Sequence, residues 1–194
     1  MSVYERQSDM NLNTNVTVSI AGIGGIGWWA TKFLAMSGVP KLYLYDIDVF
    51  EEHNLNRIDI TKDHLGRNKA EVAEEMVDEI RDDCMVSSYP FKLNANTFFE
   101  GDWILDCTDR VDAQEEIFNF AKSKKIKYLK AGYDGIFISL RNTVAQWGVA
   151  PDGYTIIPSY VCPAVSVASL AVHKILTNNK NEISSDLDTI LKDQ

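Results

Sequence analysis

The fold of this chain is best indicated by one stretch, Val16-Thr-Val-Ser-Ile-Ala-Gly-Ile-Gly-Gly-Ile-Gly27. Val16–Ala21 is short, apolar and rich in β-branched residues, which predicts a buried strand. Gly22, Gly24 and Gly27 then follow the G-x-G-x-x-G spacing. Such glycines let the backbone approach a phosphate closely, at the positive N-terminus of the helix that follows. The stretch therefore indicates a nucleotide-binding α/β fold, although a tight turn without a ligand would need the same glycines.

Expected strands and helices alternate along the first part of the chain, and the second part has a different pattern. A Pro151-Asp-Gly153 turn lies between Gly135–Gly148 and Tyr154–Ile157, which alternate like antiparallel strands. We therefore predict a Rossmann-like α/β domain whose mixed sheet has a parallel nucleotide-binding half followed by antiparallel strands, with helices on both faces. The other expected strands are Lys41–Asp46, Met85–Tyr89, Trp103–Cys107 and Lys127–Ala131, and the expected helices are Trp28–Ser37, Lys69–Ile80, Asp112–Lys122 and Ala164–Leu176.

Length and composition fit one ordinary domain between two polar ends. The chain has 194 residues, of which 45% are hydrophobic and 24% are charged. We expect an N-terminal arm at 1–15, the α/β domain at 16–177 and a polar C-terminal tail at 178–194. Nineteen basic against 28 acidic residues give a net charge of −9. This charge argues against binding to nucleic acid or to an anionic membrane surface.

The cysteines exclude one common kind of metal site. Cys84, Cys107 and Cys162 form no Cys-x-x-Cys pair, so we expect no zinc. Because Met1–Met10 has no signal-peptide pattern, we expect reduced thiols and a cytoplasmic location.

Charged residues at the ends of the expected strands point to the kind of nucleotide. Asp46 ends the second strand, where a carboxylate can accept both ribose hydroxyls of an adenosine. Arg57 and Lys69 follow it. Two such cations suit a triphosphate better than NAD, because an acidic protein must offset the phosphate charge locally. Asp109, at the end of a later strand, is a candidate ligand for Mg²⁺.

Five ordered motifs resemble the ThiF/MoeB/HesA family of ATP-dependent adenylating enzymes, which are related to the ubiquitin-activating enzymes. The resemblance runs from about Tyr4 to about Leu176. The motifs are Gly22-Ile-Gly-Gly-Ile-Gly27, Asp46-x-Asp48-x-Val49, Asn54-Leu-Asn-Arg57, Lys69-Ala70 and Asp106-Cys-Thr-Asp109.

The resemblance implies a reaction and a set of site residues. ATP would adenylate the C-terminal carboxylate of a small ubiquitin-like or sulfur-carrier protein, or of a peptide, and release pyrophosphate. Arg57 and Lys69 would act on the phosphates, Asp109 would hold Mg²⁺, and Arg6 would reach the site of the partner protomer in a homodimer. The nucleotide would be bound by Gly22, Gly24, Gly25, Gly27, Asp46, Asp48, Asn54, Arg57 and Lys69.

Several features leave alternatives open. Cys162 is either an acyl acceptor at the start of a helix or, as we favour, a buried thiol. Trp28 and Trp29 replace small residues of the family and either narrow the phosphate pocket or, as we favour, belong to the core. Arg6 could equally lie in a disordered arm. Rival functions are a non-catalytic binding partner with the same fold and an NAD-dependent oxidoreductase.

Overall fold

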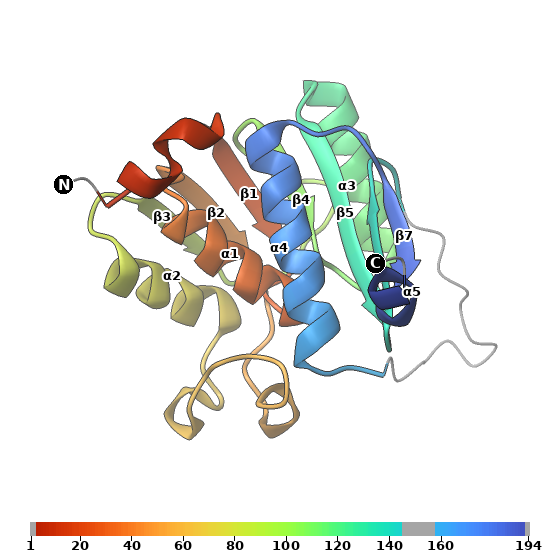
Figure 1. Cartoon of the computed structure of the whole chain (residues 1–194). Coiled ribbons are helices and arrows are strands. Elements are labelled where there is room, and N and C mark those ends of the chain that lie inside the picture. Colours follow the sequence, from red (N-terminus) through yellow and green to blue (C-terminus); the bar gives the residue numbers. More distant parts are fainter. Residues whose placement is uncertain (1–2, 145–157, 193–194) are drawn as a thin grey trace.

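A computed structural model describes residues 3–144 and 158–192 (Figure 1). A seven-stranded sheet of order β3-β2-β1-β4-β5-β6-β7 runs through the molecule. Neighbours from β3 to β5 pair in parallel, whereas β6 and β7 are antiparallel. The expected mixed sheet is thus confirmed. Its strands are β1 (Thr17–Ala21), β2 (Lys41–Tyr45), β3 (Met85–Tyr89), β4 (Trp103–Asp106), β5 (Lys127–Asp134), β6 (Phe137–Arg141) and β7 (Ile183–Asp186).

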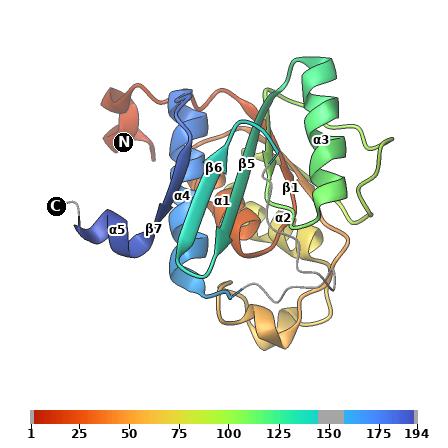
Figure 2. The same cartoon turned by 90° about the vertical axis from the view of Figure 1, so that its right-hand side faces the viewer.

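Helices cover both faces of the sheet. Helices α1, α2 and α4 lie on one face and α3 lies on the other (Figures 1 and 2). This arrangement confirms the expected two-faced α/β architecture. The helices are α1 (Gly25–Met36), α2 (Lys69–Ile80), α3 (Val111–Lys124), α4 (Val161–Thr177) and α5 (Leu187–Lys192), and the short 3₁₀ helices are η1 (Glu5–Met10), η2 (Glu52–Asn54) and η3 (Lys62–His64).

The core has two parts because both faces of the sheet are buried. Val18 and Ile20 of β1 belong to the larger cluster, under α1, α2 and α4, and Ala21 belongs to the smaller one, under α3. Burial on both faces explains why β1 reads as a continuous apolar run. Ala164 and Ala168 of α4 are fully buried, and such small side chains let α4 pack closely on α1.

The order of the strands fixes where a ligand can bind. From β1 the chain moves outward through β2 to β3 and then returns to β4, on the other side of β1. The carboxyl ends of β1 and β4 therefore form a switch point, the usual binding place in open α/β sheets. Gly22 follows β1 and Cys107 follows β4, so the glycine loop and the Asp106–Asp109 motif meet there.

Both ends of the chain carry more structure than their composition indicated. In the arm, the Gln7 amide donates a hydrogen bond to the Ser37 carbonyl (2.8 Å), and the Tyr4 ring lies 5.3 Å from the Arg81 guanidinium. At the other end, β7 extends the sheet beside β6, so the segment expected to be a polar tail contributes a strand. An edge strand needs only one buried face, which gives a weak apolar signal.

Some expectations lie outside the described residues. These are the Pro151–Gly153 turn, the strand at Tyr154–Ile157 and the end of the expected strand at Gly135–Gly148, whose described part contains β6. Within 3–144 and 158–192, no helix is both long and apolar enough to cross a membrane.

Candidate functional site

The surroundings of Gly22, Gly27 and Gly24 differ, so glycine occupies the three positions for different reasons. Gly22 has a φ of +86°, and a Cβ there would lie 3.1 Å from the Cys107 carbonyl. A Cβ at Gly27 would lie 1.9 Å from the Gly22 carbonyl oxygen, so only glycine allows α1 to pack this close to β1. A Cβ at Gly24 would meet no atom within 4 Å. The loop therefore leaves open space at Gly24, directly before α1.

The N-terminus of α1 faces this open space without a side-chain cap. Gly24 is the N-cap residue and supplies no side-chain acceptor. The N–H groups in the first turn of a helix have no partner within the helix, and the helix dipole adds a partial positive charge there. This end of α1 is thus suited to an anion such as a phosphate.

Three other segments converge on Gly25. The point where a Cβ of Gly25 would stand lies 2.9 Å from the Tyr133 hydroxyl, 3.2 Å from Cδ of Arg57 and 3.4 Å from Cβ of Ala164. The Tyr133 hydroxyl shares a hydrogen bond with the Ser159 hydroxyl. The end of β5, the loop after β2 and the start of α4 therefore enclose one side of the glycine loop. Sequence reasoning missed Tyr133 and Ser159, because nothing local links them.

Asp46 holds the glycine loop against the end of β2. One carboxylate oxygen accepts the Ile23 N–H (2.6 Å) and the other accepts the Asp48 N–H (2.8 Å). Burial raises the pKa of Asp46 above its usual range, and the nearby Lys69 ammonium partly opposes the rise. Since each carboxylate oxygen has two acceptor sites, both can still accept a ribose hydroxyl.

Lys69 begins α2 beside Asp48 and Asp46. Its ammonium lies 3.2 Å from the Asp48 carboxylate, and its side chain is only 12% exposed. Asn68, which sequence reasoning missed, accepts the Ala70 N–H (2.8 Å) as the N-cap of α2 and donates to the carbonyls of Asp46 (3.0 Å) and Asp48 (3.1 Å). An asparagine directly before a helical pattern is the signal that could have found it.

Arg57 lies in the loop after β2, in a short segment that Asn54 stabilises. The Arg57 guanidinium donates to the His53 carbonyl (2.7 Å) and to the Asn56 side chain (2.9 Å). Asn54 is 2% exposed, and its side-chain oxygen accepts the Glu51 N–H (2.9 Å). This hydrogen bond gives Asn54 a structural role in shaping the segment.

The two tryptophans of α1 support the same segment. Trp28 is 3% exposed and packs edge-on against Phe50, which confirms its expected place in the core. The half-buried Trp29 donates its indole N–H to the Arg57 carbonyl (2.8 Å). The bulk of these residues thus fixes the segment that carries Arg57.

The motif after β4 contains one buried and one exposed carboxylate. Asp106 is fully buried and accepts hydrogen bonds from the Thr108 N–H (2.9 Å) and the Tyr128 hydroxyl (2.7 Å), which confirms its structural interpretation. Burial raises the pKa of the Cys107 thiol to about 12, so this thiol stays neutral. Asp109 is exposed just before α3. The described residues hold no group of three or more His, Cys, Asp or Glu side chains that could bind a metal ion.

Arg6 and Cys162 differ in their distance from the site. Arg6 is exposed in η1, and the adjacent Gln7 donates to the carbonyl of Ser37, the C-cap of α1, so Arg6 lies at the opposite end of α1 from Gly24 and does not join the site of its own chain. Cys162 lies in the first turn of α4, near Ala164 and the glycine loop. Our expectation of a buried thiol is wrong for Cys162, because the residue is exposed, whereas Cys84 is buried.

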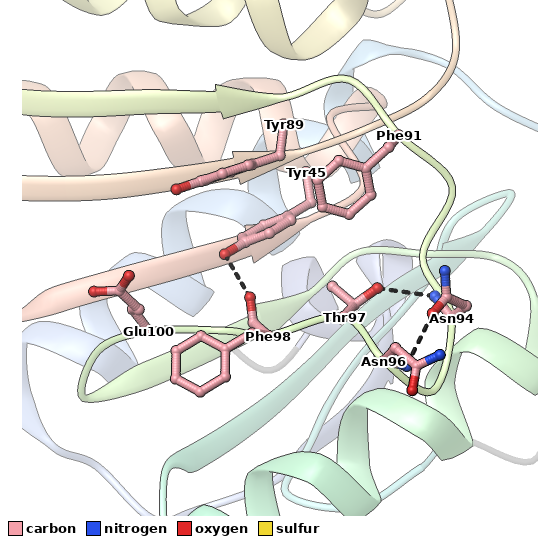
Figure 3. A pocket seen from close by; sticks show the side chains of 8 residues that line it. All are labelled: Tyr45, Tyr89, Phe91, Asn94, Asn96, Thr97, Phe98 and Glu100. Carbon is pink, nitrogen blue, oxygen red and sulfur yellow. Dashed lines mark hydrogen bonds between the residues drawn. The ribbon is translucent and has the colours of Figure 1, made fainter.

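An aromatic cleft of about 320 Å³, not anticipated from the sequence, opens on the α3 face of the sheet. The rings of Tyr45 and Tyr89 stack at 4.7 Å between centroids, and Phe91 lies edge-on to both (Figure 3). Asp46 follows Tyr45 directly, and its N–H donates to the Tyr89 carbonyl (3.3 Å). The cleft therefore borders the end of β2 that carries Asp46. In the sequence, the signal for this cleft was the pair Tyr45 and Tyr89, one aromatic residue at the end of each of two expected strands.

Comparisons with known proteins show which proteins this chain is similar to. The model of the ThiF family matches residues 5–140. Ubiquitin-like modifier-activating enzyme 5 of Drosophila persimilis is 27% identical over 145 residues, which are 66% of this chain and 36% of that protein. The adenylyltransferase and sulfurtransferase UBA4 of Eremothecium gossypii is 37% identical over 97 residues, which are 47% of this chain and 22% of that protein. The chain thus spans about a third of the length of the first of these relatives.

Solved structures share the fold at lower identity. The crystal structure of E. coli MccB with ATP has a TM-score of 0.76 and 18% identity, and the match covers 90% of this chain and 64% of that one. E. coli tRNA N6-threonylcarbamoyladenosine dehydratase, TcdA, in complex with AMP has a TM-score of 0.59 and 23% identity, over 66% of this chain and 57% of that one.

Proposed function

The chain belongs to the ThiF family, and from this premise we propose that it uses ATP to adenylate a carboxylate. An oxygen of the substrate carboxylate attacks the α-phosphorus of ATP. The bond between the α-phosphorus and the bridging oxygen to the β-phosphorus breaks, and pyrophosphate leaves. The products are an acyl-adenylate and pyrophosphate. The protein positions the reactants and offsets the phosphate charge.

The observation that carries this proposal is that two cations lie at residues that border the glycine loop. Arg57 packs on Gly25, and Lys69 lies beside Asp46, which holds the Ile23 N–H of the same loop. The chain as a whole has a net charge of −9, so these two positive charges at the loop contrast with the negative charge of the rest of the chain. A triphosphate laid from the α1 N-terminus toward them would meet positive charge along its length.

Each nucleotide-binding residue then has a part. We assign the phosphates to the backbone N–H groups of Gly24, Gly25 and Gly27, with Arg57 and Lys69 as the neighbouring cations. Gly22 serves the site through its turn, because its own N–H donates to the Tyr45 carbonyl (2.8 Å). Asp46 binds the ribose. Without ATP, Asp48 pairs with the Lys69 ammonium, and on binding of ATP the ammonium contacts the phosphates instead. Asn54 acts indirectly, because its side chain shapes the segment that carries Arg57.

Asp109 is our candidate for the magnesium ligand. Mg²⁺ commonly binds one or two carboxylates together with substrate phosphates and water. An exposed carboxylate at the switch point fits that pattern without a dedicated metal cage. When bound, the ion would offset charge on the phosphates.

The relatives support a proposal for the substrate, and the position of Arg6 supports one for the assembly. One similar protein is a ubiquitin-like modifier-activating enzyme, and one crystal structure of E. coli MccB contains MccA. We propose a small ubiquitin-like or sulfur-carrier protein, or a peptide, whose C-terminal carboxylate is activated. We further propose a homodimer in which Arg6 reaches the partner's ATP, since Arg6 lies far from the site of its own chain.

Pyrophosphate exchange into ATP, with a carrier protein ending in Gly-Gly present, tests this function. The wild type should exchange, Lys69→Ala should lose most exchange, and Lys62→Ala, which removes an exposed lysine of η3, should retain it. Full exchange by Lys69→Ala would overturn the role of Lys69. A thermal shift with NADH but none with ATP and Mg²⁺ would overturn the function, and binding of the carrier protein without any ATP binding would identify a non-catalytic partner.

A further inference from the structure

A lysine is buried in the middle of β5, directly behind the Asp106–Asp109 motif. Lys130 is 2% exposed, between the apolar residues Leu129 and Ala131. Its ammonium donates hydrogen bonds to the carbonyls of Thr108 (2.6 Å), Ala131 (3.0 Å) and Asp106 (3.2 Å). The ammonium also lies 3.6 Å from the Asp106 carboxylate. All three of its protons thus have an acceptor.

The backbone of Thr108 is held from both sides by this pair. Asp106 accepts the Thr108 N–H (2.9 Å) and its hydroxyl (2.7 Å), while Lys130 binds the Thr108 carbonyl. Gln114 adds a second donor to that carbonyl (3.1 Å). Thr108 lies one residue before Asp109 and one after Cys107, whose carbonyl lies against Gly22.

Such a pair is an unusual way to fill a core position. Burying two charges costs free energy that their attraction often fails to repay, and apolar residues of similar volume commonly serve stability as well or better. A buried ion pair does specify geometry, because each partner must be met at defined positions. Here Lys130 donates to the last residue of β4 and to the turn that follows it, at the Asp106 and Thr108 carbonyls.

We propose that Lys130 is a positioning residue that, with Asp106, fixes the turn Cys107–Asp109 against the glycine loop. The fixed turn lies against Gly22 and sets where the Asp109 carboxylate stands at the switch point. This role rests on the proposed function in so far as the switch point binds a nucleotide. The geometry of the turn itself does not depend on that.

The double variant Asp106→Asn, Lys130→Met tests the proposal. Lys130→Met alone would leave the Asp106 charge buried without its cation and could unfold the chain. In the double variant both charges are gone, and the amide oxygen of the introduced asparagine can still accept the Thr108 N–H. Lys174→Met is the matched control, because Lys174 is also buried (3% exposed) and donates to a carbonyl, that of Asn181 (2.6 Å), far along α4 from the glycine loop.

Two measurements are needed, and the first requires no ligand. Amide hydrogen exchange in the ligand-free protein should accelerate at least tenfold at Thr108, whose N–H donates to Asp106, in the double variant and stay unchanged there in Lys174→Met. Calorimetric affinity for a non-hydrolysable ATP analogue with Mg²⁺ should fall at least tenfold in the double variant only.

Unchanged exchange at Thr108 in the folded double variant would overturn the proposal, as would faster exchange with wild-type affinity for the analogue. If the wild type itself binds no nucleotide, the proposed function fails. The exchange experiment would then still decide whether Lys130 fixes the turn.

Discussion

Gly24→Ala separates the structural use of the glycine loop from its proposed use in binding phosphate. The added methyl group meets no atom within 4 Å, and the backbone at Gly24, with φ −82° and ψ −153°, suits alanine. The main cost to folding is that alanine is a poorer N-cap than glycine, by about 0.5–1 kcal/mol. For a chain of this size such a loss lowers Tm by about 1–4 °C.

Gly27→Ala is the contrasting variant, three residues along the same loop. Its methyl group would lie 1.9 Å from the Gly22 carbonyl oxygen, a backbone atom that cannot swing away. Helix α1 would have to move away from β1, at a cost of roughly 3 kcal/mol or more. We therefore expect a clear loss of Tm in Gly27→Ala.

Nucleotide affinity should follow a different order from stability. If phosphates occupy the open space, the methyl group of Gly24→Ala intrudes on them, and affinity falls at least about tenfold, or about 1.4 kcal/mol. Isothermal titration calorimetry with a non-hydrolysable ATP analogue and Mg²⁺ measures this, beside thermal melts of both variants. Wild-type affinity in Gly24→Ala would refute the placement of phosphate at this loop.

Three further predictions concern other residues. Asp46→Asn should weaken nucleotide binding, and its side chain can accept only one of the two N–H groups, of Ile23 and Asp48, that the carboxylate accepts. Burial raises the pKa of Asp46, so the stability linked to this group is full below the unfolded pKa of about 3.9 and is lost as pH rises through the folded value. The Tm of the variant relative to that of the wild type should therefore rise from pH 4 to 7, and a difference that stays constant or falls over that range would contradict this. Arg81→Met removes hydrogen bonds to the Ala35 and Val39 carbonyls and the contact with Tyr4, so limited proteolysis should cut the arm faster than in the wild type, whereas equal rates would count against the docking of the arm. Cys162→Ser should retain full pyrophosphate exchange, because adenylation forms the new bond at a carboxylate oxygen and not at the exposed thiol. Loss of exchange would mean that the thiol takes part in the first step. Mass spectrometry after incubation with the carrier and ATP shows whether an acyl adduct on the wild type disappears in the variant.

Local patterns in the sequence predicted most of the fold. The helix at Lys69–Ile80 and the strand at Met85–Tyr89 are confirmed to the residue, because hydrophobic periodicity and strand composition are local signals. Helix α1 begins at Gly25, three residues before the expected Trp28. The first turn was missed because glycine has a low helix propensity, whereas in the structure Gly25 and Gly27 of the loop form that turn.

Residues whose role depends on distant partners could not be predicted. Lys130 is buried because the Thr108 and Asp106 carbonyls stand opposite it, and Tyr133 lies at the glycine loop because β5 ends there. The burial of Cys162 was wrongly expected, since only the placement of α4 decides which side of its first turn faces solvent. Tertiary contacts decide all three, and no local pattern marks them.

A crystal structure with a non-hydrolysable ATP analogue and Mg²⁺ would show directly whether the glycine loop and the two cations bind the phosphates. We predict the phosphates in the open space at Gly24, the Lys69 ammonium and the Arg57 guanidinium within hydrogen-bond distance of them, and the ribose on Asp46. An analogue bound elsewhere, or phosphates with neither cation in contact, would contradict it.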